Sequence, residues 1–361
     1  MNEQQTMTED VLIRIEGSAG RITLNRPKAL NALNHAMVRA ITQALTQWQD
    51  DDRVKQVVID GAGERAFCAG GDIRAVYDMI LIDPELARSF WRDEYRLNAM
   101  IARYPKDYIA IIDGICFGGG VGLASHGSLC VVTERSQVSM PETAIGFTPD
   151  VGATELLAYA PCHSGAYLAA TAYRMNAADA IRAEFADAMI KSEEVPAFIA
   201  ALCKVDDSDD AGHQFGLFPG RYPGESPLAA MYGDIEAVFS ADTIQEAVRR
   251  LEVMGGSWAE ETLAKISAHS PTALAAAHYS IRKVDDFITF EENLNHEYRY
   301  AYRAVDLHDF REGVRARIID KDGKPQWRPA RLDQVKQSDV EALFAPLGKD
   351  ELGLAFRSPP S

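Results

Sequence analysis

Hydrophobic residues in the first 150 positions alternate between short β-branched runs and longer runs with helical spacing. Runs of Val, Ile and Leu between turn residues predict β-strands, and they occupy residues 11–15, 21–24, 56–60, 108–112 and 129–133. After the second run, Asn34 is placed to cap a helix that carries Met37, Ile41 and Trp48 on one face. Strands that alternate with helices predict an α/β fold with mainly parallel pairing.

The pattern changes after Asp150. Ala, Leu and Tyr accumulate with helical spacing from 155 to 186, and β-like runs become rare. Further helices are predicted at 243–253, 258–267, 270–282 and 291–307, the third of them capped by Ser270. Gly and Pro are frequent from 215 to 227, which predicts a loop. We therefore divide the chain into an α/β core at 1–200, a loop or linker at 201–233 and a helical region at 234–361.

Two glycine-rich turns each follow a strand-like run and precede a helix-like run. They are Cys68-Ala69-Gly70-Gly71-Asp72 and Phe117-Gly118-Gly119-Gly120. The first N–H groups of a helix have no partner within it, so two such turns that converge can hold a negatively charged oxygen, as an oxyanion hole does. Each turn alone also fits a structural role, with Asp72 as a helix cap and the triple glycine as a close contact between helix and strand.

An acidic segment from 140 to 150 contains Glu142 and Asp150, each preceded by a proline. A carboxylate beside a thioester carbonyl can attack it or take a proton from water. The structural alternative is that Glu142 opens a helical turn and Asp150 caps the next helix. Other chemistries fit poorly, because Leu123 stands where a dinucleotide-binding fingerprint needs glycine, and the chain has no G-x-S-x-G elbow.

Charge and composition narrow the class of partner. The chain has 37 Lys and Arg against 53 Asp and Glu, a net charge of −16. This excess of acidic residues argues against binding nucleic acid or an anionic membrane. No metal site is expected from the eight histidines, and the five scattered cysteines form no C-x-x-C pair. With no secretory signal and no apolar span in the sequence, we expect a cytoplasmic protein.

Taken together, these residues resemble the enoyl-CoA hydratase/isomerase (crotonase) superfamily. The matching segments are 25–33, 66–73 and 118–120, in the same order and spacing. The resemblance implies a spiral of ββα units followed by a helical C-terminal region, with acyl-CoA as substrate and no metal or redox cofactor. It also implies an oxyanion hole made by the N–H groups of Gly71 and Gly119.

The resemblance further implies which residues surround the substrate. Beside the glycine turns and along the adenosine–pantetheine path, these are Lys28, Ala29, Leu30, Ala66, Ala69, Gly70, Asp72, Gly118 and Gly122. Hydratases of the superfamily carry one glutamate just after the triple glycine and a second in the later acidic segment. Here the first position is Gly122 and the second is Glu142, so a two-carboxylate hydration lacks one member.

The sequence is more similar to the 3-hydroxyisobutyryl-CoA hydrolase branch of this superfamily. Matching segments lie at 93–98, 140–146, 149–152, 308–316 and 319–325, along nearly the whole chain. This resemblance implies that Glu142 acts as nucleophile or general base, that Asp150 orients Glu142 or water, and that Glu94 binds the acyl 3-hydroxyl. Gly122 then leaves room for the acyl group.

Two other functions remain open at this point. One is an enoyl-CoA hydratase or isomerase that uses Glu142 alone, and the other is a CoA-binding protein without catalysis. The intact Glu142, Gly71 and Gly119 argue against the second. Members of the superfamily commonly form trimers or hexamers, so a homo-oligomer is one expectation, and an extended C-terminal half that covers the shared surface is the other.

Overall fold

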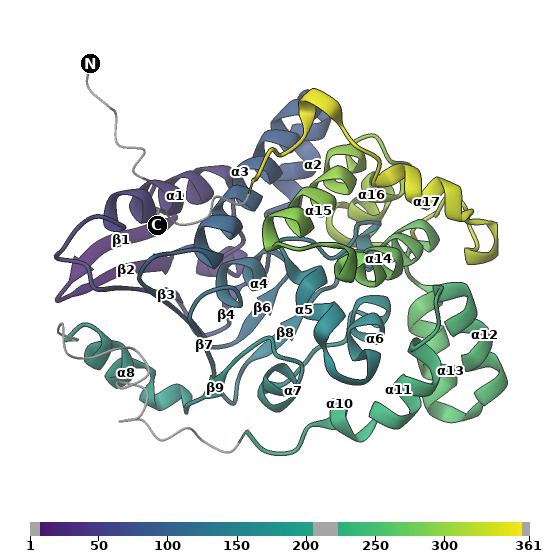
Figure 1. Cartoon of the computed structure of the whole chain (residues 1–361), viewed down its shortest axis with the longest axis horizontal. Helices are drawn as coiled ribbons and strands as arrows, with labels where there is room; N and C mark the ends of the chain where they lie inside the picture. Colours follow the sequence, from purple (N-terminus) through teal and green to yellow (C-terminus); the bar gives the residue numbers. More distant parts are fainter. Residues whose placement is uncertain (1–7, 205–222, 356–361) are drawn as a thin grey trace. The chain divides into compact units, whose positions relative to one another are not determined.

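The computed structural model describes residues 8–204 and 223–355 (Figure 1). These residues belong to two compact units. Of the described residues, the first unit contains 8–72, 96–138, 175–204 and 223–226, and the second contains 73–95, 139–174 and 227–355. The units therefore interleave along the chain and do not follow the expected order of core, linker and helical region. Segments 73–95 and 139–174 join the second unit because their helices pack on C-terminal ones, as α5 and α6 do on α14.

The main sheet of the first unit has six strands in the order β1-β2-β3-β5-β7-β9. Their bounds are Val11–Glu16, Ala19–Leu24, Gln56–Gly61, Asp107–Ile112, Leu129–Val132 and Ala188–Met189. Only β1 and β2 pair antiparallel, with Ile13 opposite Ile22, and the other neighbours are parallel. This confirms the predicted α/β class. The turn between β1 and β2 is shorter than the gap between the predicted runs 11–15 and 21–24, since Ala19 and Gly20 pair within β2.

A second, smaller sheet leads into the two glycine turns. Its order is β4-β6-β8, with bounds Ala66–Cys68, Ile115–Phe117 and Gln137–Ser139. Strands β4 and β6 are parallel, so both strands end at the same edge of the sheet, and the two glycine turns that follow them start side by side. The pairing of two short strands is thus what brings the two turns together within the first unit.

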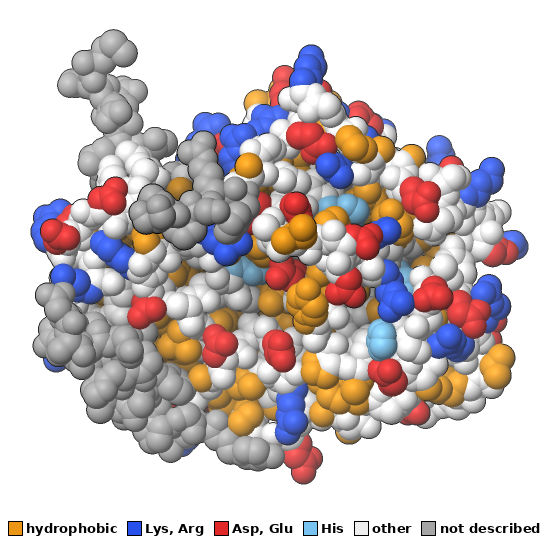
Figure 2. Space-filling model, in the orientation of Figure 1, with side chains coloured by type: hydrophobic (Ala, Val, Ile, Leu, Met, Phe, Trp, Pro, Cys, Tyr) orange, Lys and Arg blue, Asp and Glu red, His pale blue; other side chains and the backbone are white. Residues whose placement is uncertain are grey.

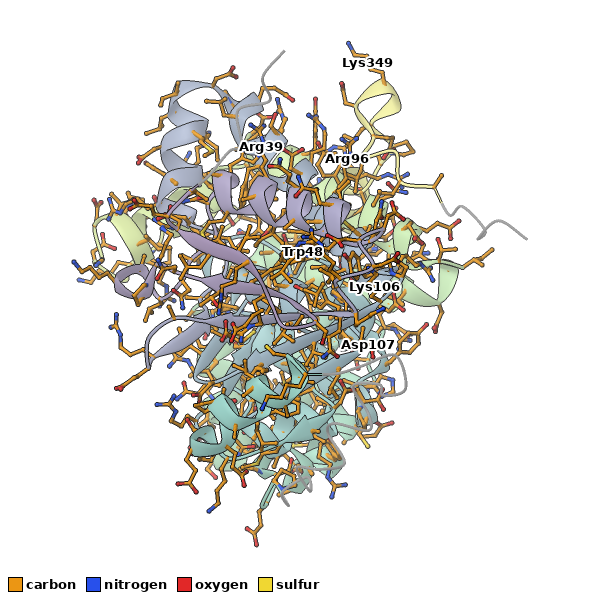
Figure 3. All side chains as sticks on the ribbon, turned by 90° about the vertical axis from the view of Figure 1, so that its left-hand side faces the viewer. Arg39, Trp48, Arg96, Lys106, Asp107 and Lys349 are labelled. Carbon is orange, nitrogen blue, oxygen red and sulfur yellow. The ribbon has the colours of Figure 1, made fainter. Side chains whose placement is uncertain are left out.

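Helix α1 (His35–Trp48) forms where the apolar spacing predicted it. The side chain of Asn34 accepts a hydrogen bond from the Met37 amide at 2.9 Å, which confirms the predicted cap. Lys106, labelled with Trp48 in Figure 3, donates to the backbone oxygens of Trp48 and Asp51 at 2.5 and 2.8 Å and ties the end of α1 to the start of β5. The other helices of this unit are α4 (Gly119–Ala124), α7 (Ala177–Arg182) and α8 (Val195–Leu202), with 3₁₀ turns η1 (Pro27–Ala29) and η4 (Ser192–Glu194).

The second unit is helical. Its helices are α2 (Ile73–Ile82), α5 (Ala153–Tyr159), α6 (Ser164–Thr171), α10 (Pro227–Ala230), α11 (Tyr232–Phe239), α12 (Ile244–Met254), α13 (Gly256–Ser267), α14 (Pro271–Lys283), α15 (Phe290–Ala304), α16 (His308–Val314) and α17 (Gln337–Leu343). Short turns are η2 (Glu142–Ile145), η3 (Pro161–His163), η5 (Val284–Asp286), the π-helical η6 (Arg315–Ile319), η7 (Leu332–Gln334) and η8 (Gly348–Asp350). Helix α3 (Pro84–Ala102) contributes residues to both units.

The predicted cap of one helix in this unit is confirmed, and the predicted linker contains helical residues. Ser270 caps α14 by accepting a hydrogen bond from the Ala273 amide at 3.2 Å. The described part of the expected linker at 201–233 contains α10 and the start of α11, and Leu228 in α10 is fully buried. Residues 205–222 of that linker lie outside the described residues.

The described surface mixes charges of both signs. On the face shown in Figure 2, acidic and basic side chains are interspersed and no single-sign field covers it. In the segments 8–204 and 223–355, no helix is both long and apolar enough to cross a bilayer.

Candidate active site

The two glycine turns approach each other closely through their backbones. Gly70 has φ +97, and a Cβ built on it would lie 3.0 Å from the oxygen of Phe117 and 3.5 Å from the nitrogen of Gly119. A Cβ on Gly120 would lie 2.6 Å from the oxygen of Cys68. Side chains at 70 and 120 would push the turns apart, so glycine is required there for the close approach.

The N–H groups of Gly71 and Gly119, which we call the amide pair, are both left over by the backbone. Leu33 donates to the oxygen of Gly70 and accepts from the amide of Asp72, so the Gly71 amide between them points away from Leu33. Gly119 is the first residue of α4, where an N–H has no partner in its own helix. In the described chain, neither amide donates a backbone hydrogen bond outside helices and strands. The first unit therefore holds two adjacent unused donors.

The residues expected along the CoA path also lie in the first unit. Lys28 and Ala29 are exposed, and Leu30 is half-buried with φ 51. The amide of Ala69 donates to the oxygen of Leu30 at 3.0 Å, so this strip runs directly beside the first glycine turn. Ala66, by contrast, is buried, and its oxygen accepts from the Asn31 side chain at 2.8 Å.

Asp72 and Gly122 have structural surroundings of their own. Asp72 lies 3.0 Å from the guanidinium of Arg26, an ion pair between the first glycine turn and the segment before η1. Gly118 precedes α4 with φ 50, a conformation that favours glycine. Gly122 lies buried inside α4, with no side chain at the position where hydratases of the superfamily carry a glutamate.

The second unit contains a group of three buried carboxyls, Glu94, Glu142 and Asp150, which we call the carboxyl cluster. They are only 3, 7 and 6% exposed. Glu142 begins η2, Glu94 lies on α3, and Asp150 ends the loop after η2. Asp150 accepts a hydrogen bond from the hydroxyl of Tyr95 at 2.6 Å. The structure thus brings all three predicted carboxyls into one unit and adds a tyrosine.

Burial and mutual repulsion set the protonation of this cluster. Burial, and then the charge of Asp150, raise the pKa of both Glu94 and Glu142 well above the usual range. Burial raises the pKa of Asp150 to about 7, against the lowering effect of the Tyr95 hydrogen bond. Like charges this close do not all ionise together, so the cluster holds protons near neutral pH. Such perturbed carboxyls are typical of catalytic sites.

Two oxygens of the cluster have no hydrogen-bond partner among the described residues. Oε1 of Glu94 and Oε2 of Glu142 are buried and make no hydrogen bond to any part of the chain that the structure describes. An unpaired buried oxygen is destabilising, and a substrate hydroxyl or a water molecule can supply the missing partner. The Asp150 carboxyl is instead already held by Tyr95.

The turn that carries Glu142 is fixed by its neighbours. The Thr143 hydroxyl donates to the oxygen of Ala169 at 2.8 Å, so the Nδ1–H of His269, 3.0 Å away, donates to that hydroxyl. Burial lowers the pKa of His269 to about 4, which keeps its ring neutral. The amide of Ser270 donates to the oxygen of Thr143 at 3.1 Å.

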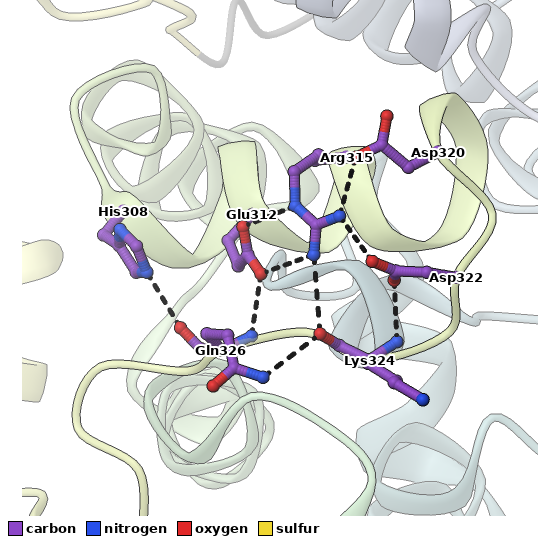
Figure 4. A network of polar contacts seen from close by, with 7 residues as sticks. All are labelled: His308, Glu312, Arg315, Asp320, Asp322, Lys324 and Gln326. Atoms are coloured by element: carbon purple, nitrogen blue, oxygen red, sulfur yellow. Dashed lines mark hydrogen bonds and ion pairs between the residues drawn. The ribbon is translucent and has the colours of Figure 1, made fainter.

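Helix α16 packs against the same turn through two glycines. A Cβ on Gly146 would lie 2.3 Å from the oxygen of Asp309, and one on Gly313 would lie 2.4 Å from the oxygen of Ile145. Arg315, which follows α16, binds Glu312 of that helix and residues of the irregular segment after η6 (Figure 4). Its partners are Glu312, Asp320, Asp322 and the backbone oxygen of Lys324. Of the segments that carried the family resemblance, 308–316 thus packs on the Glu142 turn, and 319–325 is bound to 308–316 through Arg315.

A buried aromatic group joins the segments that carry Glu94 and Glu142. Phe147 stacks on Trp91 with ring centres 5.2 Å apart. It also contacts Phe310 at 5.2 Å and Tyr300 at 5.5 Å. Trp91 precedes Glu94 on α3, and Phe147 follows Glu142, so this packing fixes the spacing between the two carboxyls.

Sequence reasoning missed two residues next to the cluster, Tyr95 and Glu297. Tyr95 follows Glu94 in the segment 93–98, which carries part of the family resemblance, and its fully buried hydroxyl needs a hydrogen-bond partner. Glu297 lies on α15, is 2% exposed and accepts hydrogen bonds from the loop after Asp150. Nothing local marks it, because glutamate is common on helices and its burial is decided by tertiary packing.

Comparison with known proteins identifies the family. A sequence profile described as enoyl-CoA hydratase/isomerase matches residues 19–344. The chain belongs to this family. Among curated relatives, the 3-hydroxyisobutyryl-CoA hydrolase, mitochondrial, of Xenopus laevis is 39% identical over 95% of this chain and 90% of its own length. The human protein of the same name is 37% identical over 98% of this chain and 92% of its own length. The resemblance to the superfamily and to its hydrolase branch is confirmed.

Solved structures confirm the fold. A carnitinyl-CoA dehydratase from Mycobacterium thermoresistibile is 41% identical with a TM-score of 0.90, covering 96% of this chain and 98% of that one. An enoyl-CoA hydratase from Rhodobacter sphaeroides 2.4.1 is 42% identical with a TM-score of 0.89, covering 96% of this chain and 100% of that one. These two proteins are named for reactions that differ from that of the curated relatives, so family and fold alone do not decide the reaction, and the site residues must do so.

In the described residues, no group of three or more His, Cys, Asp or Glu side chains is arranged to hold a metal ion. Burial is the main reason that the carboxyls of the cluster keep raised pKa values.

Proposed function

We propose that this protein hydrolyses the thioester of 3-hydroxyisobutyryl-CoA, or of a closely related short 3-hydroxyacyl-CoA, to the free hydroxy acid and CoA. The observation that carries the proposal is Glu142, a buried carboxyl with a raised pKa and one unpaired oxygen. The names of the curated relatives support the same reaction. On this proposal the protein acts in the breakdown of valine.

The proposed reaction begins with the thioester oxygen between the N–H groups of Gly71 and Gly119. In one route the Glu142 carboxylate attacks the carbonyl carbon, the C–S bond breaks, CoA leaves as a thiolate, and water cleaves the resulting anhydride. In the other route Glu142 takes a proton from water, which attacks directly. Asp150, held by Tyr95, orients Glu142 or the water. Neither route uses a metal or redox cofactor.

Hydroxylamine distinguishes the two routes. It traps a mixed anhydride as a hydroxamate after the thiol has left, so hydroxamate that replaces the free acid without faster thiol release supports the nucleophilic route. On the direct route hydroxylamine competes with water for the thioester itself, so hydroxamate forms together with faster thiol release. Both routes need the carboxylate form of Glu142. Because its pKa is raised, the rate is expected to rise with pH through the neutral range.

The second candidate is hydration or dehydration of an acyl-CoA, because the two similar solved structures are named as a carnitinyl-CoA dehydratase and an enoyl-CoA hydratase. The absence of a carboxylate at Gly122 argues against it. The test offers 3-hydroxyisobutyryl-CoA, crotonyl-CoA and carnitinyl-CoA to the pure protein with a thiol reagent. Thiol release from the first, without hydration of the second or dehydration of the third, supports hydrolysis. Hydration of crotonyl-CoA without thiol release overturns it.

A cytoplasmic location and a homo-oligomer remain predictions. The curated relatives carry the word mitochondrial in their names, so fractionation of the source cells tests the first. Sedimentation of the pure protein tests the second, since a homo-oligomer and a monomer differ by at least twofold in mass.

A further inference from the structure

The turn that follows Asp150 has an unusual backbone. Val151 has φ 55 and Gly152 has φ 83, so two consecutive residues lie in the left-handed region. Glycine adopts this conformation freely, but a β-branched residue there is a genuine outlier. Such a conformation persists only when surrounding contacts hold it, and it is often found at active sites.

Glu297 on α15 supplies those contacts. Its Oε2 accepts the amide of Gly152 at 2.7 Å, and its Oε1 accepts the amide of Thr154 at 3.2 Å. The same Oε1 contacts the Thr154 hydroxyl closely and accepts from the Asn293 side chain at 3.3 Å. One buried carboxyl therefore binds two of the three amides that follow the strained residue, and the third, that of Ala153, donates to the oxygen of Asp150 at 2.9 Å.

Asp150 is fixed from both sides as a result. Tyr95 holds its side chain by a hydrogen bond of 2.6 Å, and Glu297 holds the backbone two and four residues later. If the turn relaxed, Val151 would return to ordinary backbone angles and the Asp150 carboxyl would move. A displacement of about 1 Å in a catalytic group can lower a rate about 100-fold.

We infer that Glu297 is a positioning residue that holds the strained turn 151–152 and thereby sets the place of Asp150. The inference rests on the proposed function insofar as Asp150 takes part in thioester hydrolysis. The holding itself is a structural property that can be measured without any substrate.

The first experiment measures amide hydrogen exchange by mass spectrometry in the full-length protein. In Glu297→Gln one acceptor oxygen becomes an NH₂ group, which cannot accept the second amide. Exchange in a peptide covering 151–157 is expected to become at least about tenfold faster, as the amides of Gly152 and Thr154 lose protection. Unchanged exchange in this peptide overturns the inference, whatever the activity.

The matched control is Glu292→Gln, the same chemical change at an exposed position on α15. It should leave exchange in 151–157 unchanged. If Glu297→Gln does not fold, Thr154→Val and Thr154→Ser replace it, because the first removes the hydroxyl that contacts Glu297 and the second keeps it. Faster exchange only in the valine variant supports the inference, and equal exchange in both overturns it.

The second experiment tests the link to Asp150 by kinetics. Glu297→Gln is expected to lower kcat about 10- to 100-fold with KM changed less than about threefold. In an Asp150→Asn background the same change should lower kcat by less than about threefold, since effects through one group are not additive. If Glu297→Gln lowers kcat by the same factor in the wild type and in the Asp150→Asn background, Glu297 does not act through Asp150. If the wild type releases no thiol from any acyl-CoA, the proposed function fails, while hydrogen exchange still decides whether Glu297 holds the turn.

Discussion

The amide pair of the first unit consists of backbone groups, whereas the carboxyl cluster of the second consists of side chains. Gly71 and Gly119 contribute backbone N–H groups, brought together by the parallel strands β4 and β6. The cluster is made of side chains from α3, η2 and the loop before α5. Backbone donors carry fixed partial charges, whereas each carboxyl can gain or lose a proton. The amide pair should therefore donate hydrogen bonds equally well at all pH values, whereas the charge of the carboxyl cluster depends on how many protons it holds.

The largest effect is expected from Glu142→Gln in the carboxyl cluster. The amide can neither attack a thioester nor take a proton from water, so kcat should fall about 1,000-fold or more. Thiol release from 3-hydroxyisobutyryl-CoA measures this, with Glu260→Gln on the exposed side of α13 as the control. Turnover unchanged in Glu142→Gln would remove the cluster from the mechanism.

Asp150→Asn should change how stability depends on pH. Burial raises the pKa of Asp150 from 3.8 to about 7, so the folded protein binds this proton more tightly than the unfolded chain. The stabilisation that the folded protein gains from binding this proton is complete below about pH 4 and is lost as the pH rises to about 7. At about 1.36 kcal/mol per pH unit, the stability of the variant relative to wild type should rise by about 4 kcal/mol over this range.

Urea unfolding at several pH values measures this difference. The exposed Asp52→Asn is the control, and its stability relative to wild type should stay flat. A difference for Asp150→Asn that does not vary with pH would contradict the raised pKa.

On the side of the amide pair, Gly119→Pro removes one N–H donor. Proline is tolerated at the first position of a helix, which Gly119 occupies, so the fold should survive. Loss of one oxyanion-hole donor lowers kcat about 100- to 1,000-fold. Gly119→Ala keeps the N–H and is the matched control, and equal kcat values for the two variants would show that this amide has no catalytic role. The loss in the proline variant should be the same at pH 6 and pH 8.

A smaller effect is expected at Glu94, which has a buried oxygen without a partner among the described residues and which we expect to bind the acyl hydroxyl. Glu94→Met keeps the length of the side chain but not its polar atoms, whereas Glu94→Gln keeps a hydrogen-bonding group. The ratio of kcat/KM for 3-hydroxyisobutyryl-CoA over isobutyryl-CoA should fall about 10- to 100-fold in the methionine variant. It should fall less in the glutamine variant. Equal falls on both substrates would assign Glu94 to the shared thioester chemistry instead.

Local sequence predicted the parts of the molecule that depend on local physics. The strands β1, β2, β3, β5 and β7, the caps at Asn34 and Ser270 and the glycine turns formed as expected. Alternation of apolar residues and capping side chains act over a few residues, so they can be read directly. The helix α10 in the expected linker was not predicted, because the burial of Leu228 cannot be read from this Gly- and Pro-rich stretch of sequence.

The candidate site divides in the same way. Glu142 and Asp150 stand out in the sequence because they lie in one short segment and each directly follows a proline. Tyr95 and Glu297 do not, since each acquires its role only by reaching residues far along the chain, 55 positions away for Tyr95 and 145 for Glu297. The pKa of Asp150 was equally out of reach, because burial sets it.

The sequence by itself determined the class of fold, the two glycine turns, the family and which carboxyls to examine, because strand patterns, caps and glycine requirements are local. Only the tertiary structure decided that the Gly71 amide is turned away from Leu33, that Glu94 and Glu142 each keep an unpaired oxygen, and that Glu297 holds a strained turn. Burial, hydrogen-bond partners and protonation are properties of surroundings, and the folded chain creates those surroundings from residues that the sequence keeps apart.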